Sequence, residues 1–295
     1  MNASKRGNVS RSTRVAVPRK RTVPVKTEVI SLEGPAGTQT LARGLAVVDA
    51  VARGARDVKE IGKLVGTARS TTHRLVVCLI QAGYLRRSAE LGYLLGPKLI
   101  EFGFQAREEI SLSTLARPSL DALAGSTGDT IHLGVRDGDH VLYLDKISGT
   151  KGLEMRSRVG SRMRIATTAM GKVLILDAGE SEWRRCYEIG TDAALDSSPT
   201  PQTRLTWEEF RENMRTNVAA QYAFDLEENE LSIRCVAAPI RDADHHIIAA
   251  VSVSSTVPYM PMKRMRELAK LLRDAASEIS SQLGWRAAIA PSSKA

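Results

Sequence analysis

The chain has 295 residues, with 42 lysines and arginines against 33 aspartates and glutamates, and 43% of its residues are hydrophobic. This length predicts about two domains, and the apolar share excludes a wholly disordered chain. Three widely spaced cysteines exclude a disulfide framework and a four-cysteine zinc site. No apolar run is long enough for a transmembrane helix, and the basic N-terminus is not followed by the apolar segment of a secretory signal. We therefore expect a soluble cytoplasmic protein with no membrane partner, metal or cofactor.

The excess positive charge lies in the first third of the sequence. Residues 1–40 carry eight basic and two acidic side chains (+6), residues 41–96 carry nine and four (+5), and residues 97–295 carry 25 and 27 (−2). This asymmetry predicts an anionic partner for the N-terminal part, either nucleic acid or an anionic membrane, and of the two we expect nucleic acid. Residues 1–40 show no helical or strand periodicity, so we expect a disordered basic tail that either adds phosphate contacts or only keeps the protein soluble.

Residues 41–66 predict the first two helices of a helix-turn-helix. Asp57 is expected to cap the second helix with Glu60 as its capping-box partner, and Gly66 is expected to end it. The first helix carries four apolar residues at helical spacing, which we expect on its buried face: Leu41, Leu45, Val48 and Ala52.

The third helix, with Thr67 as its expected N-cap, carries the polar and cationic face of a recognition helix, and Cys78 is expected to be a small buried hydrophobe. The N-terminal end of such a helix enters the major groove, where arginine binds guanine and hydroxyls reach bases or phosphates. Residues 84–96 predict a two-stranded wing with arginines at its bend. The predicted DNA-binding residues are Arg69, Ser70, Thr71, His73, Arg74, Arg86 and Arg87. A winged helix that binds protein instead of DNA is the alternative, and His73 could be a merely solvated helix residue.

The remaining sequence predicts a linker helix over residues 97–110, a mixed domain over 111–286 and a short tail over 287–295. Alternating apolar runs predict two hairpins, one turning at Asp137 and Gly138 and one at residues 242–245, and a further strand is expected at 152–159. Helical patterns lie between the hairpins and at the C-terminal end. Since the strands come in hairpins rather than in βαβ crossovers, the predicted fold class is α+β, with an antiparallel sheet flanked by helices.

Several motifs occur in one order between residues 40 and 285: "STTHRL" and "GYLRR", then "TGDTIHLGVRDGDHVLYLDKI", "TTAMGKVLILDAG", "YAFDLEENELSIRC" and "IIAAVSVSST". Together they resemble the IclR family of bacterial transcriptional regulators. The resemblance implies a winged helix-turn-helix, a linker helix and a GAF-like effector domain, in dimers often paired into tetramers on a palindromic operator. The sequence departs from the family at residues 164–166, usually Pro-Leu-His, and at Ser232, usually Gly. Both departures lie near the pocket or its lid and leave the identity of the ligand open.

The resemblance also implies the residues of an effector pocket: Ala169, Met170, Asp225, Cys235, Ser252 and Ser254. The residue pattern agrees, because serines two apart on a strand share one face and the N–H groups at a helix start can hold a carboxylate. We therefore expect a small organic acid, aromatic or keto, as the effector. The alternatives are serines satisfied by their neighbours, a cysteine in an ordinary core and an aspartate that only holds a turn. Leu153, Met155 and Met170 either line the apolar part of the pocket or fill the core.

These observations predict a ligand-responsive DNA-binding regulator, more a repressor than an activator, that controls a nearby catabolic operon and is not an enzyme. An enzyme with Cys235 as nucleophile beside Asp225 would need a base, and only His132 has a route inward, although strand parity sets it opposite Ile131 and Leu133. No phosphate loop, metal-ligand spacing or nucleophile elbow occurs. A redox-sensing thiol at Cys235 is a third hypothesis.

Overall fold

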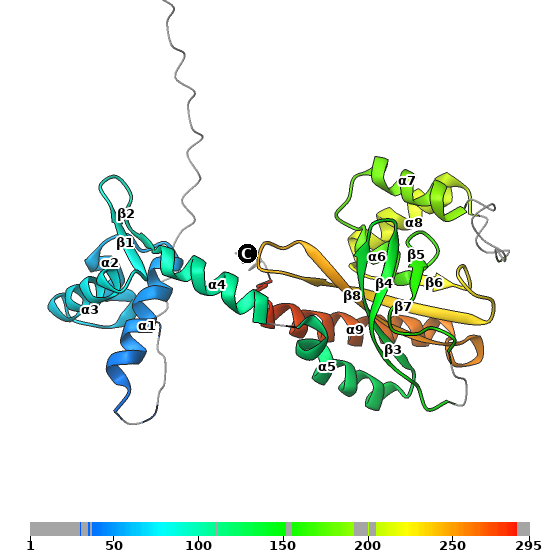
Figure 1. Ribbon diagram of the computed structural model, residues 1–295, viewed down its shortest axis with the longest axis horizontal. Coiled ribbons are helices and arrows are strands. Elements are labelled where there is room, and N and C mark those ends of the chain that lie inside the picture. The colour runs from blue at the N-terminus through cyan, green and yellow to red at the C-terminus, as the bar shows by residue number, and fades with distance from the viewer. Residues whose placement is uncertain are drawn as a thin grey trace, which may run out of the picture. The chain divides into compact units, whose positions relative to one another are not determined.

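The structure, a computed structural model, describes residues 30, 35, 37–109, 111–151, 155–191, 200 and 205–287. The chain divides into two compact units, residues 1–109 and residues 110–295 (Figure 1). The predicted tails at 1–40 and 287–295 lie almost entirely outside the described residues. No helix among the described residues is both long and apolar enough to cross a membrane.

The N-terminal unit is a helix-turn-helix followed by a two-stranded wing, as predicted. It consists of α1 (Gln39–Ala52), α2 (Val58–Val65), α3 (Arg69–Gln81), β1 (Leu85–Ser88), β2 (Gly92–Leu95) and α4 (Pro97–Glu109). The Asp57 carboxylate caps α2 by accepting hydrogen bonds from the backbone of Lys59 and Glu60, and Gly66 ends the helix in the left-handed conformation, with φ of 68°. Glu60 reaches back to the N–H of Arg56, one residue before the position that a capping box would use.

The buried face of α1 differs from the predicted one. Leu41 and Leu45 are 65% and 52% exposed, whereas the core contains the smaller residues of the adjacent face: Ala46, Val47, Ala50 and Val51. Small side chains let α1 approach α2 and α3, and this close packing outweighs the simple spacing of the larger residues.

Two further local predictions for α3 are wrong. Ala68 and not Thr67 is the N-cap residue, because the Thr67 hydroxyl is engaged with the hydroxyl of Thr72 at 2.8 Å between their Oγ1 atoms. Cys78 is exposed rather than buried.

The C-terminal unit is built on a six-stranded antiparallel sheet with the order β5-β4-β3-β8-β7-β6. Its strands are β3 (Thr130–Asp137), β4 (His140–Ile147), β5 (Arg162–Arg164), β6 (Ala223–Leu226), β7 (Ile233–Arg241) and β8 (Ile247–Thr256). Its helices are α5 (Leu112–Thr127), α6 (Ala169–Leu174), α7 (Glu180–Thr191), α8 (Trp207–Ala220), the 3-10 helix η2 (Val257–Tyr259) and α9 (Met262–Gln282). The antiparallel sheet with flanking helices confirms the predicted fold class.

The sheet has two different faces, each covered by its own helices (Figure 1). The side chains of Ile131 and Leu133 on β3 and of Val251 and Val253 on β8 form a purely apolar core with α5 and α9. The opposite face, here called the inner face, packs against α6, α7 and α8. Because successive strand residues alternate between faces, the residues between these apolar ones lie on the inner face.

The predicted strand at 152–159 is wrong for the part that the structure describes. Residues 155–159 form no strand, and the edge strand β5 follows three residues later. The Lys146 ammonium donates hydrogen bonds to the carbonyls of Met155 and Ser157 at 2.7 and 2.8 Å, so a side chain rather than a neighbouring strand satisfies them. Residues 152–154 lie outside the described part of the chain.

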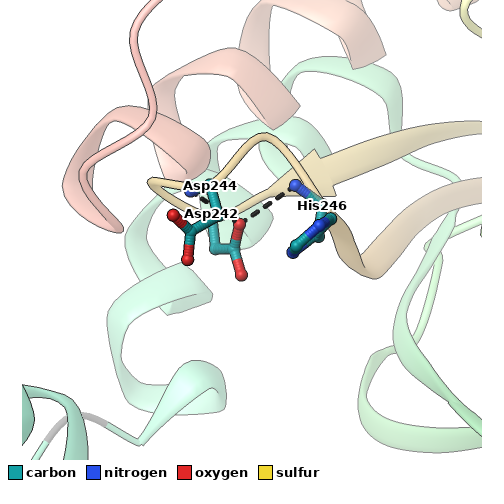
Figure 2. A group of neighbouring side chains, drawn as sticks. All are labelled: Asp242, Asp244 and His246. Carbon is teal, nitrogen blue, oxygen red and sulfur yellow. Dashed lines mark hydrogen bonds between the residues drawn. The ribbon is translucent and has the colours of Figure 1, made fainter. Parts of the chain in front are cut away.

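The hairpin between β7 and β8 turns at residues 242–246, close to the prediction. One oxygen of Asp242 accepts hydrogen bonds from the backbone N–H groups of Asp244 and His246, both at 3.0 Å (Figure 2). The ligand atoms of these three side chains lie within 4.8 Å of one another. These two hydrogen bonds close the turn, and they explain why the three side chains lie close together.

Candidate functional site

Two surfaces of the N-terminal unit hold the predicted DNA-binding residues. On α3, Arg69, Ser70, His73 and Arg74 are exposed and Thr71 is half-buried. The opposite side of the helix is buried through Thr72 and Val76, which holds α3 against the other two helices. Ala68 at the N-cap offers no side-chain acceptor, so the N–H groups of the first turn are available to an anion.

The wing arginines lie on β1 rather than at the bend that the sequence predicted. Arg86 and Arg87 are opposite Leu94 and Tyr93 of β2, and both are exposed. Adjacent strand residues point to opposite faces, so the two arginine side chains lie on different faces of the wing. None of the arginines at positions 69, 74, 86 and 87 forms an ion pair with another described residue. Their charge is therefore available to an external anion such as a phosphate.

The predicted effector residues of the strands meet on the inner face of the sheet. Ser254 on β8 lies between Thr130 on β3 and Cys235 on β7, and Cys235 is in turn opposite Asp225 on β6. We call these four residues the first polar row. The neighbouring positions form a second row, polar on three strands and alanine on two: Lys146, His132, Ser252, Ala237 and Ala223, on β4, β3, β8, β7 and β6.

Most of the polar side chains in these rows are buried. Ser252 and Ser254 are each 3% exposed, and Asp225 is 1% exposed. Cys235 is half-buried between Ser254 and Asp225. Burial, followed by the Asp225 carboxylate, raises the pKa of the Cys235 thiol well above its ordinary value. The thiol is therefore protonated at neutral pH, which disfavours a nucleophile or a redox sensor at this position, since both need the thiolate.

Asp225 has a structural role in the turn that follows β6. Its Oδ1 accepts hydrogen bonds from the N–H groups of Glu228, at 2.8 Å, and Asn229, at 3.4 Å. Burial, with a further contribution from the Glu228 carboxylate, raises the pKa of Asp225 to about 7. The side chain thus holds a turn, as the alternative interpretation expected, and near neutral pH it exists in both its protonated and ionised forms.

A buried ion pair that the sequence did not indicate lies beside Asp225. The Lys172 ammonium on α6 contacts the Glu228 carboxylate at 2.5 and 2.6 Å and donates to the Phe224 carbonyl at 2.9 Å. Lys172 is only 2% exposed. These bonds attach α6 to the end of β6. The sequence signal that could have indicated this ion pair is a lysine within the apolar "TTAMGKVLILDAG" motif, because a buried lysine needs an acidic partner.

The start of α6 packs on the inner face, where it brings Ala169 and Met170 to the sheet. Thr168 is the N-cap, and its hydroxyl accepts from the N–H of Gly171 at 3.0 Å. The N–H groups of the first two helical positions have no partner within the helix itself. Gly134 on β3 permits this approach, since a Cβ there would lie 2.5 Å from the Met170 sulfur.

The two departures from the family pattern have structural consequences. Ile165 and Ala166 are buried against α6, and Arg164 donates to the Gly190 carbonyl at 2.7 Å. Ser232 has φ of 64°, in the left-handed region that favours glycine. The backbone conformation that glycine adopts freely is therefore retained here by a residue with a Cβ.

His132 is a buried residue of the inner face whose place the sequence left in doubt. It is 2% exposed and lies directly opposite Ser252 of the neighbouring strand. Its Nε2 lies 2.7 Å from the Ser157 hydroxyl, and its ring stacks on Tyr143 with centroids 4.7 Å apart. Strand alternation predicted that His132 lies on the face opposite to Ile131 and Leu133, and this is the face that carries Ser252 and Ser254.

The comparisons with known proteins cover both units. The family model "IclR helix-turn-helix domain" matches residues 40–89, and "Bacterial transcriptional regulator IclR C-terminal" matches residues 104–281. The chain is 33% identical over 252 residues to the HTH-type transcriptional regulator XynR of Escherichia coli (strain K12), covering 84% of this chain and 98% of XynR. It is 32% identical over 263 residues to the DNA-binding transcriptional repressor YiaJ of the same strain, covering 86% and 90%.

Solved structures show the same fold. The Agobacterium tumefaciens repressor BlcR superposes with a TM-score of 0.72 at 23% identity, over 85% of this chain and 99% of BlcR. The Thermotoga maritima IclR superposes with a TM-score of 0.54 at 28% identity, over 84% and 100%. With both domains matched and the relatives covered almost end to end, this chain belongs to the IclR family of DNA-binding bacterial transcriptional regulators.

Proposed function

We propose that this protein is a transcriptional repressor that releases its operator when a small organic acid binds on the inner face of its sheet. The observation that supports this proposal is the pair of serines, Ser252 and Ser254, buried on the inner face beside Cys235 and Asp225. In this proposal residues 41–96 read DNA, residues 97–110 link, and residues 111–286 sense the effector. The protein acts in the cytoplasm on a catabolic operon near its own gene.

The DNA-reading half of the proposal rests on exposed cations that form no ion pair with a described residue. The N-terminal end of α3 enters the major groove, where Arg69 and Arg74 contact bases or phosphates, and the wing arginines contact the backbone. Two recognition helices on a palindromic operator would be spaced by about 34–36 Å or a multiple of it.

Self-association is supported by apolar side chains that lie in solvent on two helices of the N-terminal unit. Leu41 and Leu45 on α1 and Ile100 and Phe104 on α4 are each between 52% and 65% exposed. Large exposed apolar patches commonly mark protein–protein contacts. We therefore propose dimers formed at least in part through this unit, with pairing of dimers into tetramers as in the family.

The sensing half rests on the chemistry of the inner face. The Ser252 and Ser254 hydroxyls can donate to a carboxylate, and so can the N–H groups at the start of α6. Asp225 would repel an acid if it were fully ionised, but its pKa of about 7 lets the protonated form donate a hydrogen bond instead. Met170 supplies apolar contact for the rest of an aromatic or keto acid.

The two halves are coupled by a shift between conformations. The acid binds one arrangement of the effector domains better than the other and thereby changes the spacing of the two winged helices. A ligand can shift this equilibrium only by as much as its affinity differs between the two arrangements.

The test uses one variant in the DNA-binding unit and one in the effector site, so that DNA binding and effector sensing are measured separately. The operator is obtained by selecting DNA that the full-length protein binds, and effectors by a thermal-shift screen of aromatic and keto acids. Arg74→Ala should weaken operator binding by about 1–3 kcal/mol, roughly 5- to 150-fold, and leave thermal stability unchanged. Ser252→Ala should bind operator as the wild type does but respond weakly to the acid.

Two results would contradict this division of roles. One is a folded Ser252→Ala protein that has lost operator binding, and the other is a folded Arg74→Ala protein that binds operator with wild-type affinity. Circular dichroism of both variants establishes that each is folded.

A further inference from the structure

We propose that His132 is a further effector-binding residue and that its Nδ1 recognises a hydroxyl group, so that the effector is a hydroxy acid. This inference rests on the proposed effector site and narrows its ligand. The acid's carboxylate would bind at Ser252 and Ser254, and its hydroxyl would reach the imidazole on the neighbouring strand.

The first observation is an unsatisfied buried nitrogen. His132 is 2% exposed, and its Nδ1 has no hydrogen-bond partner among the residues that the structure describes. Buried polar groups in proteins nearly always have a partner, and leaving one unsatisfied costs about 1–3 kcal/mol. A ligand atom that bonds to Nδ1 would recover this energy.

The second observation is that the ring is held in one orientation. Ser157 holds Nε2 at 2.7 Å, while Tyr143 stacks on the ring at an interplanar angle of 21°. Lys146 bonds the carbonyls of Met155 and Ser157, so the segment that carries the Ser157 hydroxyl is itself attached to β4. Nδ1 is therefore presented from a fixed position, as recognition of a ligand requires.

The third observation is position. His132 is directly opposite Ser252, and Ser254 is two residues further along the same strand and on the same face. Neighbouring strands are about 4.8 Å apart, so side chains on one face of adjacent strands lie within the reach of a small hydroxy acid. One small molecule can thus contact the serines and the imidazole together.

The neutral imidazole favours a ligand hydroxyl, because a hydroxyl can both donate and accept. Burial and the nearby Lys146 ammonium lower the pKa of His132 to about 3, so the ring is neutral and carries one N–H and one lone pair. The Ser157 hydroxyl can donate or accept, and either tautomer is therefore compatible with the bond to Nε2. A ligand hydroxyl satisfies Nδ1 in both tautomers, whereas a ketone or a second carboxylate, which can only accept, satisfies it in one of the two.

The experiment compares matched acids by calorimetry: benzoate with 4-hydroxybenzoate, and butyrate with 3-hydroxybutyrate. The full-length wild type should bind at least one hydroxy acid about tenfold more tightly than its parent. His132→Phe keeps the aromatic ring but no nitrogen, and should lose this preference, so that this variant binds the hydroxy acid and its parent equally. His132→Asn places an amide where Nδ1 lies and should retain part of the preference, whereas His132→Gln, whose amide lies near Nε2, should not.

The outcomes separate this inference from the proposed function. A His132→Phe protein that keeps the preference, or a wild type without one or without affinity for any of the four acids, overturns the hydroxy-acid assignment. If His132→Phe does not fold, equal preferences in the Asn and Gln variants overturn it. Ser252→Ala tests the site itself: unchanged affinity of this variant for an acid that the wild type binds would show that the effector site is wrong, whatever the His132 variants do.

Discussion

Charged side chains are exposed to solvent in the winged-helix unit but buried beside the sheet of the C-terminal unit. Arg69, Arg74 and the wing arginines are exposed and make no ion pair with a described residue, so nothing inside the unit competes with an external phosphate. On the inner face of the sheet, Lys172 and Asp225 are at most 2% exposed and are bonded within the protein. A charge in water needs no partner, whereas a charge out of water must have one. The comparison therefore predicts small stability effects in the first unit and large ones in the second.

The largest effect is expected at the buried ion pair. Lys172→Met removes the ammonium and leaves the Glu228 carboxylate buried beside Asp225, which should lower the free energy of unfolding by about 3–5 kcal/mol. Chemical denaturation followed by tryptophan fluorescence measures this change, because Trp183 and Trp207 lie in the same unit.

Two control variants show whether burial is the cause. Lys172→Met combined with Glu228→Leu removes both charges and should recover most of the lost stability. Glu188→Gln breaks the exposed pair with Arg184, whose side chains are 59% and 61% exposed, and should change stability by less than about 1 kcal/mol. Equal losses at the buried and the exposed pair would contradict the comparison.

An intermediate, pH-dependent effect is expected at His132. Its pKa of about 3 in the folded protein lies below the unfolded value of about 6.5, so folding excludes a proton that the unfolded chain binds. The wild type should therefore lose stability as pH falls from about 7 towards 3, by about 2 kcal/mol at pH 5. His132→Phe lacks this titration.

The measurement is the difference in unfolding free energy between wild type and His132→Phe at several pH values. The unfolding free energy of wild type minus that of the variant should be highest at pH 7 and above and should fall on acidification. Because Asp225 is present in both proteins, its own raised pKa cancels in the difference. A difference that stays constant from pH 7 to pH 5 would mean that the imidazole is protonated as easily inside the protein as outside.

The smallest effect is expected at an exposed cap of the winged helix. Asp57→Ala removes the acceptor for two N–H groups at the start of α2 and should cost about 1 kcal/mol. Thr38→Ala at the N-cap of α1 is the matched control, because the Thr38 side chain makes no cap bond to its helix. The control should stay within about 0.5 kcal/mol of wild type by far-UV circular dichroism. A larger loss from Thr38→Ala than from Asp57→Ala would show that capping is not what stabilises these helix starts.

Much of the fold was predictable because its signals are local. Alternation and turn residues predicted both hairpins, and at the start of α8 the structure shows a local capping box between Thr206 and Glu209. The errors occurred where distant packing decided the outcome. Small residues of α1 replaced its leucines in the core, and Lys146 drew residues 155–157 away from the sheet edge. Helix α7 was not predicted.

By itself the sequence determined most of the order of the elements, the cationic first third and which residues of a strand share a face, because all three depend on neighbours in the chain. Parity alone placed Ser252 and Ser254 on one face. Only the tertiary structure decided which strands are adjacent and in which register, and this register brings His132 beside Ser252 and Cys235 beside Asp225. Burial then followed from packing against α6, and burial is what raises the pKa of Asp225 and lowers that of His132.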